Sequence, residues 1–299
     1  MDTRANSNNM NPAPRVSVGM PVYNGEKFIR ESIASILRQS FRDLELIISD
    51  NASTDATERI CREFATKDRR IRYYSNPVST DVTENYNRVF HYARGDYFKW
   101  ASCNDVCAQE FIYRCVDVLD RRPDVVLCYP KTGLFDTEIT DAEDYEDNLD
   151  LQEEDPPSRF LHLIERMGLN NALNGVIRTE VLRRTPLHKH FAGSDINLMA
   201  ELTLYGKFVE VPERLFYRRM NAEASACLGG EKHMQQYLWP QRRKAMLFRT
   251  WKSFWEYFAV VLRSPLTYRD KYTLYLKIMR WLRWSRWQLI REVKSAARY

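Results

Sequence analysis

Long apolar runs are missing from this sequence of 299 residues. No stretch of about 18 uninterrupted apolar residues is present, so the sequence predicts no transmembrane helix. Residues 1–14 are rich in Asn and Pro and contain no apolar segment of the kind that a signal peptide requires, and we expect a flexible tail there. Together these absences favour a cytoplasmic protein.

Glycine and paired cysteines are also scarce. Only 10 residues are Gly, while 44% are hydrophobic and 28% charged, which is not the composition of a collagen, a disulfide scaffold or a disordered chain. The six cysteines form no Cys-x-x-Cys pair, and no His lies at zinc-finger spacing from them, so a structural zinc site is not expected. Without a secretory leader, we expect free thiols in a reducing compartment.

The net charge of +5 is unevenly distributed. Residues 242–299 contain 15 Lys and Arg against 3 Asp and Glu, a net charge of +12, so the preceding residues sum to −7. The basic character therefore belongs to one end of the chain. This predicts a local partner surface and argues against general nucleic-acid affinity.

Short apolar runs alternate with helical patterns in the first half of the chain. Helical spacing is found in 28–37, 56–65, 84–93 and 109–121, and Asp55 with Glu58 predicts a capping box. The intervening runs are strand-like: Val16–Met20, Leu44–Ser49, Ile71–Tyr74, Tyr97–Ala101 and Val125–Tyr129. This alternation predicts an α/β, Rossmann-like fold with a mainly parallel sheet flanked by helices.

The middle of the chain opens with a strongly acidic segment. Residues 136–155 contain eleven Asp and Glu and no Lys or Arg, which is typical of a solvated, mobile loop. A loop that folds over an acceptor is the alternative. Beyond it, we expect helices at 159–167 and 196–205 and strands at 172–178 and 208–211.

The C-terminal region is predicted to be helical, basic and aromatic. Five of the seven tryptophans lie there among Lys and Arg, and one helix face carries Leu274, Ile278, Trp281, Leu282 and Ser285. Such helices lie well at a membrane interface. A helical hairpin that packs on the catalytic domain is the alternative, and nucleic-acid binding is less favoured because no recognition motif accompanies the charge.

Two carboxylates fall just after predicted strands, where ligands of parallel sheets collect. Asp105 could hold a divalent metal that offsets the charge of a nucleoside diphosphate. Asp50 could bind the pairing edge of a nucleobase, and Tyr23 could offer it an aromatic face. Taken alone, an Asp after a strand is more often a helix cap or turn residue.

The order of several motifs resembles family 2 of the glycosyltransferases. The segments that carry the resemblance are Val16–Glu26, Ser35–Phe41, Ile48–Asp55, Gly95–Phe98 and Cys103–Asp105. The resemblance covers Arg15 to Pro130 and reappears at Ala192–Arg219. It implies a GT-A fold, a nucleotide-sugar donor and transfer with inversion at the anomeric carbon.

The resemblance also assigns roles to single residues. Pro21 and Tyr23 would line the base pocket, and Asp50 would bind the base. Asn104 and Asp105 occupy the family's metal-binding positions, with Asp105 as the ligand of Mg²⁺ or Mn²⁺. Asn85 and Asn87 are weaker candidates for the nucleotide pocket, and Arg218 and Arg219 could contact the diphosphate. Asp195 falls where the family places its catalytic base, although Ser194 or Asp195 could simply cap the following helix.

The sequence departs from the family pattern near the same site. Asn104 stands where an acid is common, which would weaken metal binding, and Cys103 and Asn221 are further departures. A catalytically weak or inactive nucleotide-sugar-binding or scaffold protein is therefore the alternative to an enzyme. A third hypothesis is an interaction protein that acts through its basic tail.

The expected organisation follows from these assignments. After the tail, residues 15–240 form the GT-A domain, with a nucleotide-sugar-binding half at 15–130 and an acceptor and catalytic half at 131–240. Residues 241–299 form the amphipathic helical extension. Expected partners are a UDP-, GDP- or dTDP-linked sugar, a glycan or lipid-linked acceptor of cell-envelope or polysaccharide synthesis, and the cytosolic membrane surface.

Overall fold

The computed structural model describes residues 13–221 and 248–296. The predicted tail at 1–14 lies almost wholly outside the described residues, as do Cys227 and residues 241–247 of the predicted helical extension.

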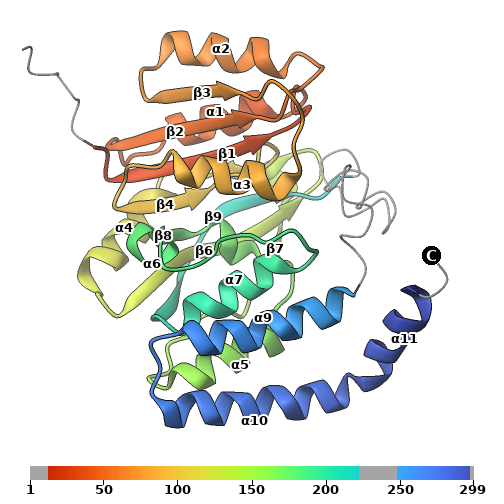
Figure 1. The fold of residues 1–299 in the computed structure, drawn as a ribbon. Coiled ribbons are helices and arrows are strands. Elements are labelled where there is room, and N and C mark those ends of the chain that lie inside the picture. The colour runs from red at the N-terminus through yellow and green to blue at the C-terminus, as the bar shows by residue number, and fades with distance from the viewer. Residues whose placement is uncertain (1–12, 222–247, 297–299) are drawn as a thin grey trace, which may run out of the picture.

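A single twisted sheet runs through the molecule (Figure 1). Its strands lie in the order β3-β2-β1-β4-β8-β6-β9-β5, and β7 pairs with β6 at the side. Strands β1 to β4 run parallel to one another, β6 and β9 are parallel to each other, and β8 is antiparallel between β4 and β6. The strands are β1 Val16–Val22, β2 Leu44–Asp50, β3 Ile71–Ser75, β4 Tyr97–Trp100, β5 Val106–Cys107, β6 Val125–Phe135, β7 Glu143–Tyr145, β8 Val176–Arg178 and β9 Lys207–Arg219.

Helices cover both faces of this sheet. One face carries α1, α2 and α4, whose apolar residues pack with those of β1 and β2 in one core cluster. The other face carries α3, α5, α7 and the C-terminal helices in a second cluster. The helices are α1 Ile29–Leu37, α2 Thr57–Lys67, α3 Val82–His91, α4 Phe111–Arg121, α5 Pro156–Arg166, α6 Thr179–Leu182, α7 Ser194–Thr203, α9 Arg249–Arg263, α10 Tyr268–Trp284 and α11 Arg286–Ala296.

This architecture confirms the α/β fold with a mainly parallel sheet. Every strand-like run predicted in the first half is a strand, and β1, β2 and β4 are buried along their whole length, as a covered parallel sheet requires, whereas the outermost strand β3 is mostly half-buried. The chain order reverses between β2-β1 and β4, so the carboxyl ends of β1 and β4 flank a switch point.

Three local predictions are wrong in whole or in part. The strand expected at 172–178 begins only at Val176, because Asn171–Asn174 form a 3-10 helix. The capping box at α2 does not form, because Asp55 accepts hydrogen bonds from Thr57 N (2.9 Å) and Glu26 N (3.0 Å) instead, and Glu58 pairs with Arg62. The acidic segment 136–155 exposes most of its acids, as a solvated loop would, but it is not irregular throughout. It contains β7 and buries Leu149, Leu151 and Asp147.

The C-terminal helices pack on the rest of the protein. Phe254, Tyr257 and Val260 of α9 enter the same core as Phe160 of α5, and α10 lies beneath α9 along the lower edge in Figure 1. The predicted inner face of α10 is confirmed at Leu274 and Ile278, which are buried, while Trp281 and Leu282 are half-buried. Within 13–221 and 248–296, no helix has the length and hydropathy that crossing a membrane requires.

Candidate active site

The predicted donor segments lie together at the carboxyl edge of the sheet. Val22 of β1 is in register with Asp50 of β2, which is in register with Ser75 of β3. The segment after β4 reaches the same edge, because Ala101 N donates to Gly19 O (2.8 Å). A Cβ added to Gly25 would lie 3.2 Å from Cys103 Sγ, so the turn after β1 and the turn before Asp105 pack directly against each other.

Asp50 is buried and firmly held. Its Oδ1 accepts from Ser53 N (2.9 Å), and its Oδ2 accepts from Tyr73 Oη (2.8 Å). Pro21 is buried within β1, and Tyr23 is half-buried just beyond the strand. The carboxylate thus shapes the turn after β2, and its predicted contact with a nucleobase stays a prediction.

Asn85 and Asn87 of α3 are engaged with backbone atoms. Asn85 Nδ2 donates to Ser49 O (2.9 Å), and its Oδ1 accepts from Ser49 Oγ (2.6 Å), which ties α3 to β2. Asn87 brackets His188: its Nδ2 donates to His188 O (2.9 Å) and its Oδ1 accepts from His188 N (3.1 Å). Both amides therefore fix the position of α3 against neighbouring segments. Their contacts with a nucleotide stay predictions.

Asp105 is held by the end of β9. Its Oδ1 accepts from Arg219 N (3.0 Å), and Arg219 Nε donates to Asn104 O (3.2 Å). The guanidinium of Arg219 lies between the rings of Phe28 and Phe135, 4.4 Å from each centroid, and pairs with Glu31 at 2.5 Å. Arg219 therefore holds the Asn104–Asp105 turn in place through its backbone N–H and its guanidinium.

The charges around Asp105 suit an anionic ligand that arrives with a cation. Desolvation by the surrounding protein raises the pKa of Asp105, whereas the Arg219 N–H and the charges of Arg218, Lys99 and Arg219 lower it. Among the described residues, no hydrogen-bond partner engages Oδ2 of this carboxylate. Asp105 with the neutral oxygen of Asn104 fits a cation that gains its remaining ligands from water and a diphosphate.

Arg218 links Asp105 to the second half of the site. Its Nη1 donates to Leu169 O and to Asn171 Oδ1, both at 2.7 Å. Between these two residues, Asn170 Nδ2 donates to Asp195 Oδ2 (2.8 Å). Asn170 has φ of 56°, a left-handed conformation that Asn tolerates better than most residues. The segment 169–171 therefore joins Arg218 on one side to Asp195 on the other.

Asp195 lies in the first turn of α7 and does not cap the helix. Gly193 is the N-cap, with φ of 93°, and no side chain makes a capping hydrogen bond there. The alternative that Ser194 or Asp195 caps this helix is therefore wrong. The half-buried carboxylate stands at the N-terminal end of α7.

His188 is a neighbour of Asp195 that sequence reasoning missed. Its ring packs edge-on against Trp100, with centroids 4.9 Å apart, and its buried Nε2 has no hydrogen-bond partner among the described residues. Burial lowers the pKa of His188 to about 4, against the opposing charge of Asp195. The imidazole of His188, close to the Asp195 carboxylate, is therefore neutral at physiological pH.

We expect His188 to make the protein less stable in mild acid. Between the ordinary pKa of 6.5 and the folded pKa of about 4, the unfolded chain binds more protons at this residue. The free energy of unfolding should therefore fall by roughly 2 kcal/mol between pH 7.5 and pH 5. In urea unfolding, the free energy of unfolding of His188→Gln should fall less between pH 7.5 and pH 5 than that of wild type. The variant His91→Gln, at an exposed histidine, should lose as much as wild type. An unchanged pH dependence in His188→Gln would contradict the expectation.

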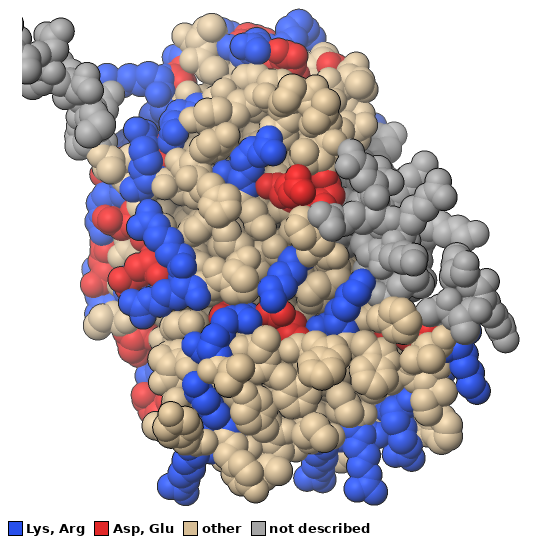
Figure 2. Space-filling model, viewed as in Figure 1, with Lys and Arg blue, Asp and Glu red and all other residues tan. Residues whose placement is uncertain are grey.

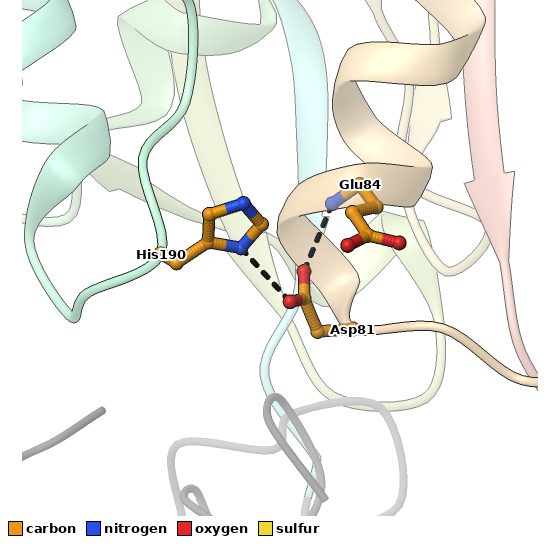
Figure 3. Close-up of side chains that lie close together, drawn as sticks. All are labelled: Asp81, Glu84 and His190. Atoms are coloured by element: carbon orange, nitrogen blue, oxygen red, sulfur yellow. Dashed lines mark hydrogen bonds and ion pairs between the residues drawn. The ribbon is translucent and has the colours of Figure 1, made fainter. Parts of the chain in front are cut away.

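Three side chains of types that can ligate a metal lie close together at the start of α3 (Figure 3). One ligand atom from each of Asp81, Glu84 and His190 lies within 4.8 Å of the others. Asp81 Oδ1 accepts from Glu84 N (3.0 Å) and its Oδ2 pairs with His190 Nδ1 (2.8 Å). Asp81 thus caps α3 and anchors the segment that leads to Asp195, and a cation there would have to displace the contact between Asp81 and His190.

The chain is similar to known glycosyltransferases. The family described as "Glycosyl transferase family 2" matches residues 17–146. The putative glycosyltransferase EpsE of Bacillus subtilis (strain 168) is 36% identical over 113 residues, which cover 38% of this chain and 41% of that protein. The first half of this chain is therefore similar to glycosyltransferases of family 2, and the match spans less than half the length of that relative.

Solved structures with the same fold extend the likeness to most of the chain. TarS 1–349 of S. aureus in complex with UDP-GlcNAc has a TM-score of 0.61 at 15% identity, over 89% of this chain and 71% of that one. The mannosyltransferase PcManGT from Pyrobaculum calidifontis, in complex with GDP-Man and Mn²⁺, has a TM-score of 0.58 at 15% identity, over 95% and 74% of the two chains. The fold is GT-A, as the sequence motifs implied.

Proposed function

We propose that this protein is an inverting glycosyltransferase. It would move a sugar from a UDP-, GDP- or dTDP-linked donor to a hydroxyl of a glycan or lipid-linked acceptor, in cell-envelope or polysaccharide synthesis at the cytosolic face of a membrane. The observation that carries the proposal is the chain of contacts from Asp105 through Arg219, Arg218 and residues 169–171 to Asp195. The family of the first half supports the donor class.

Asp195 is the proposed general base. Its carboxylate would accept the proton of the acceptor hydroxyl as that oxygen attacks the anomeric carbon opposite the leaving phosphate. The hydrogen bond from Asn170 Nδ2 leaves Oδ1 of the carboxylate for this task and fixes its direction. A positioned carboxylate contributes roughly 10²–10⁴-fold to such a reaction.

Arg218 and the Asn104–Asp105 turn are the proposed holders of the diphosphate. The Arg218 guanidinium would offset phosphate charge with donors in a fixed geometry. Mg²⁺ or Mn²⁺, held by Asp105, would supply Lewis-acid stabilisation of the leaving nucleoside diphosphate. TarS in complex with UDP-GlcNAc and PcManGT in complex with GDP-Man and Mn²⁺ have the same fold, which supports this donor class.

A catalytically weak or inactive nucleotide-sugar-binding protein is the second candidate. One observation favours it: Asn104 is neutral where the family has an acid, so the proposed metal site holds one negative charge fewer. Donor hydrolysis separates the two candidates. A panel of UDP-, GDP- and dTDP-sugars left intact in Mn²⁺, with binding retained, would favour the binding protein.

Donor binding itself is tested by thermal unfolding. We expect one nucleoside diphosphate among UDP, GDP and dTDP to raise Tm by roughly 5 °C at a hundredfold excess over its Kd. The shift should grow when Mn²⁺ is present and should be smaller for the matching monophosphate. If no nucleotide raises Tm under either condition, the proposed donor site is wrong.

A further inference from the structure

The outer face of α10 is not needed to hold the fold together. The helix packs on α9 through buried Leu274 and Ile278, and Trp281 lies 4.8 Å from Phe254 between ring centroids. Tyr275 stacks on Phe258 at 5.7 Å. These contacts satisfy the inner face, so apolar residues on the opposite side require another explanation.

That opposite side carries a row of exposed apolar side chains. Tyr268, Tyr272, Leu276 and Met279 recur at spacings of four, four and three residues, which places them on one face of the helix. Their exposed fractions are 92%, 64%, 54% and 53%. The exposed side chains continue along the chain as Trp284, Trp287, Ile290 and Val293. Contiguous apolar surface of this kind marks an interaction site.

Basic side chains accompany this apolar row. Residues 268–294 contain eight Lys and Arg against two acids, Asp270 and Glu292. Asp270 is bonded to Thr267 Oγ1 (2.7 Å) and Glu292 accepts from Thr250 N (2.9 Å), so both acids are engaged within the helical region. Figure 2 shows Lys and Arg spaced along the lower edge of the molecule, where α10 runs in Figure 1, with uncharged residues between them.

Aromatic and cationic groups are paired on this surface. Arg280 lies over the ring of Trp284 (4.8 Å) and Arg286 over that of Trp287 (5.5 Å). Trp and Tyr combine an apolar ring with a polar group, and Arg extends its charge beyond an apolar stem, so both suit the boundary between lipid chains and headgroups. A nucleic acid is a less suitable partner, because it would pair with the basic groups but leave Leu276 and Met279 exposed to water.

We propose that the outer face, defined as Tyr268, Tyr272, Leu276, Met279, Trp284 and Trp287 with Arg269, Arg280, Arg283 and Arg286, docks on an anionic lipid bilayer. The helix lies in the plane of the headgroups, and its apolar side chains enter the acyl boundary. The basic groups pair with anionic lipids, each contributing roughly a fivefold gain in partitioning.

Docking at this face would orient the proposed active site. α9 joins α10 to α7, because Asn197 Nδ2 of α7 donates to Ser253 O of α9 (3.1 Å). Asp195 lies two residues before Asn197, and its charge contributes to raising the pKa of buried Tyr257 on α9. This orienting role rests on the proposed function, whereas vesicle binding does not.

Vesicle flotation of the full chain tests the docking face. We expect binding to vesicles of phosphatidylcholine with phosphatidylglycerol, and little binding to phosphatidylcholine alone. Raising salt from about 0.1 M to about 1 M should weaken binding, because it shortens the Debye length from about 10 Å to about 3 Å. Arg280→Gln with Arg283→Gln should lose roughly 25-fold in partitioning.

Matched variants distinguish this face from general charge. Arg114→Gln with Arg121→Gln removes two cations from α4 and should leave flotation unchanged. Tyr272→Ser with Leu276→Ser and Met279→Ser keeps every charge and should still abolish insertion. Equal flotation of this triple variant and wild type, or a dimer in solution that the triple variant disrupts, would overturn the proposal. Donor hydrolysis by the same variants should match that of wild type. Flotation therefore tests the docking face, and donor hydrolysis tests the proposed function separately.

Discussion

Asp195→Asn is expected to lower turnover by about 10²–10⁴-fold, because it removes the proposed general base. The substitution keeps the shape of the side chain, and the amide oxygen can still accept the hydrogen bond that Asn170 Nδ2 donates at 2.8 Å. The fold and the donor affinity should therefore be retained. Donor hydrolysis under saturating donor gives kcat, and calorimetric titration of the nucleoside diphosphate gives Kd.

Two companion variants define how Asp195 acts. Asn170→Gly removes the hydrogen bond while accepting the φ of 56°, so it should lower kcat by less than Asp195→Asn does. Glu165→Gln, at an exposed carboxylate of α5, should leave kcat unchanged. Wild-type turnover in Asp195→Asn would move the base to another residue, and loss of donor affinity in that variant would point to a structural role.

The donor half of the site could be located from sequence because its signals are local. Asp50 and Asp105 follow short apolar runs, and the carboxyl ends of parallel strands meet at one edge of the sheet whatever the details of the loops. The partners of these carboxylates are distant in sequence. Asp105 is bonded to Arg219, 114 residues away, and no local pattern announces that contact.

The acceptor half was less accessible for the same reason. Asn170 is one polar residue in a turn, and only its left-handed φ and its bond to Asp195, 25 residues on, give it a role. His188 likewise gains its low pKa from burial beside Trp100, which spacing does not reveal. The Asn170-Asn171 pair after Gly168 was the available signal, since Asn is enriched where φ is positive.

The number of acids predicted only part of the structure of residues 136–155. The eleven acids suggested a solvated loop, but Leu149 and Leu151 are fully buried, and Leu151 pairs with Phe208 of β9. Asp147 is buried with them because Thr132 Oγ1 (2.8 Å) and Asn171 Nδ2 (3.3 Å) donate to its Oδ2. A few well-placed apolar side chains thus outweigh many charges that can remain in water.

Asp105→Asn is expected to weaken nucleoside diphosphate binding in Mn²⁺ by about 10–100-fold, since an interaction with a charged group is worth roughly 1.5–3 kcal/mol. The substitution preserves an oxygen that can accept from Arg219 N, so the turn should keep its geometry. In EDTA the variant should bind the diphosphate at least as tightly as wild type, because without a cation the Asp105 carboxylate only repels the phosphates. Calorimetric titration under the two conditions measures both values.

Asn104→Asp is the matched variant in the opposite direction. It supplies a second carboxylate beside Asp105, so it should tighten binding in Mn²⁺ and, through repulsion of the diphosphate, weaken binding in EDTA. Weaker binding of the diphosphate by Asp105→Asn and tighter binding by Asn104→Asp, each seen in Mn²⁺ and not in EDTA, would assign the cation to this turn. If Asp105→Asn binds the diphosphate in Mn²⁺ as tightly as wild type, the metal site lies elsewhere, and Asp81, Glu84 and His190 become the residues to substitute next.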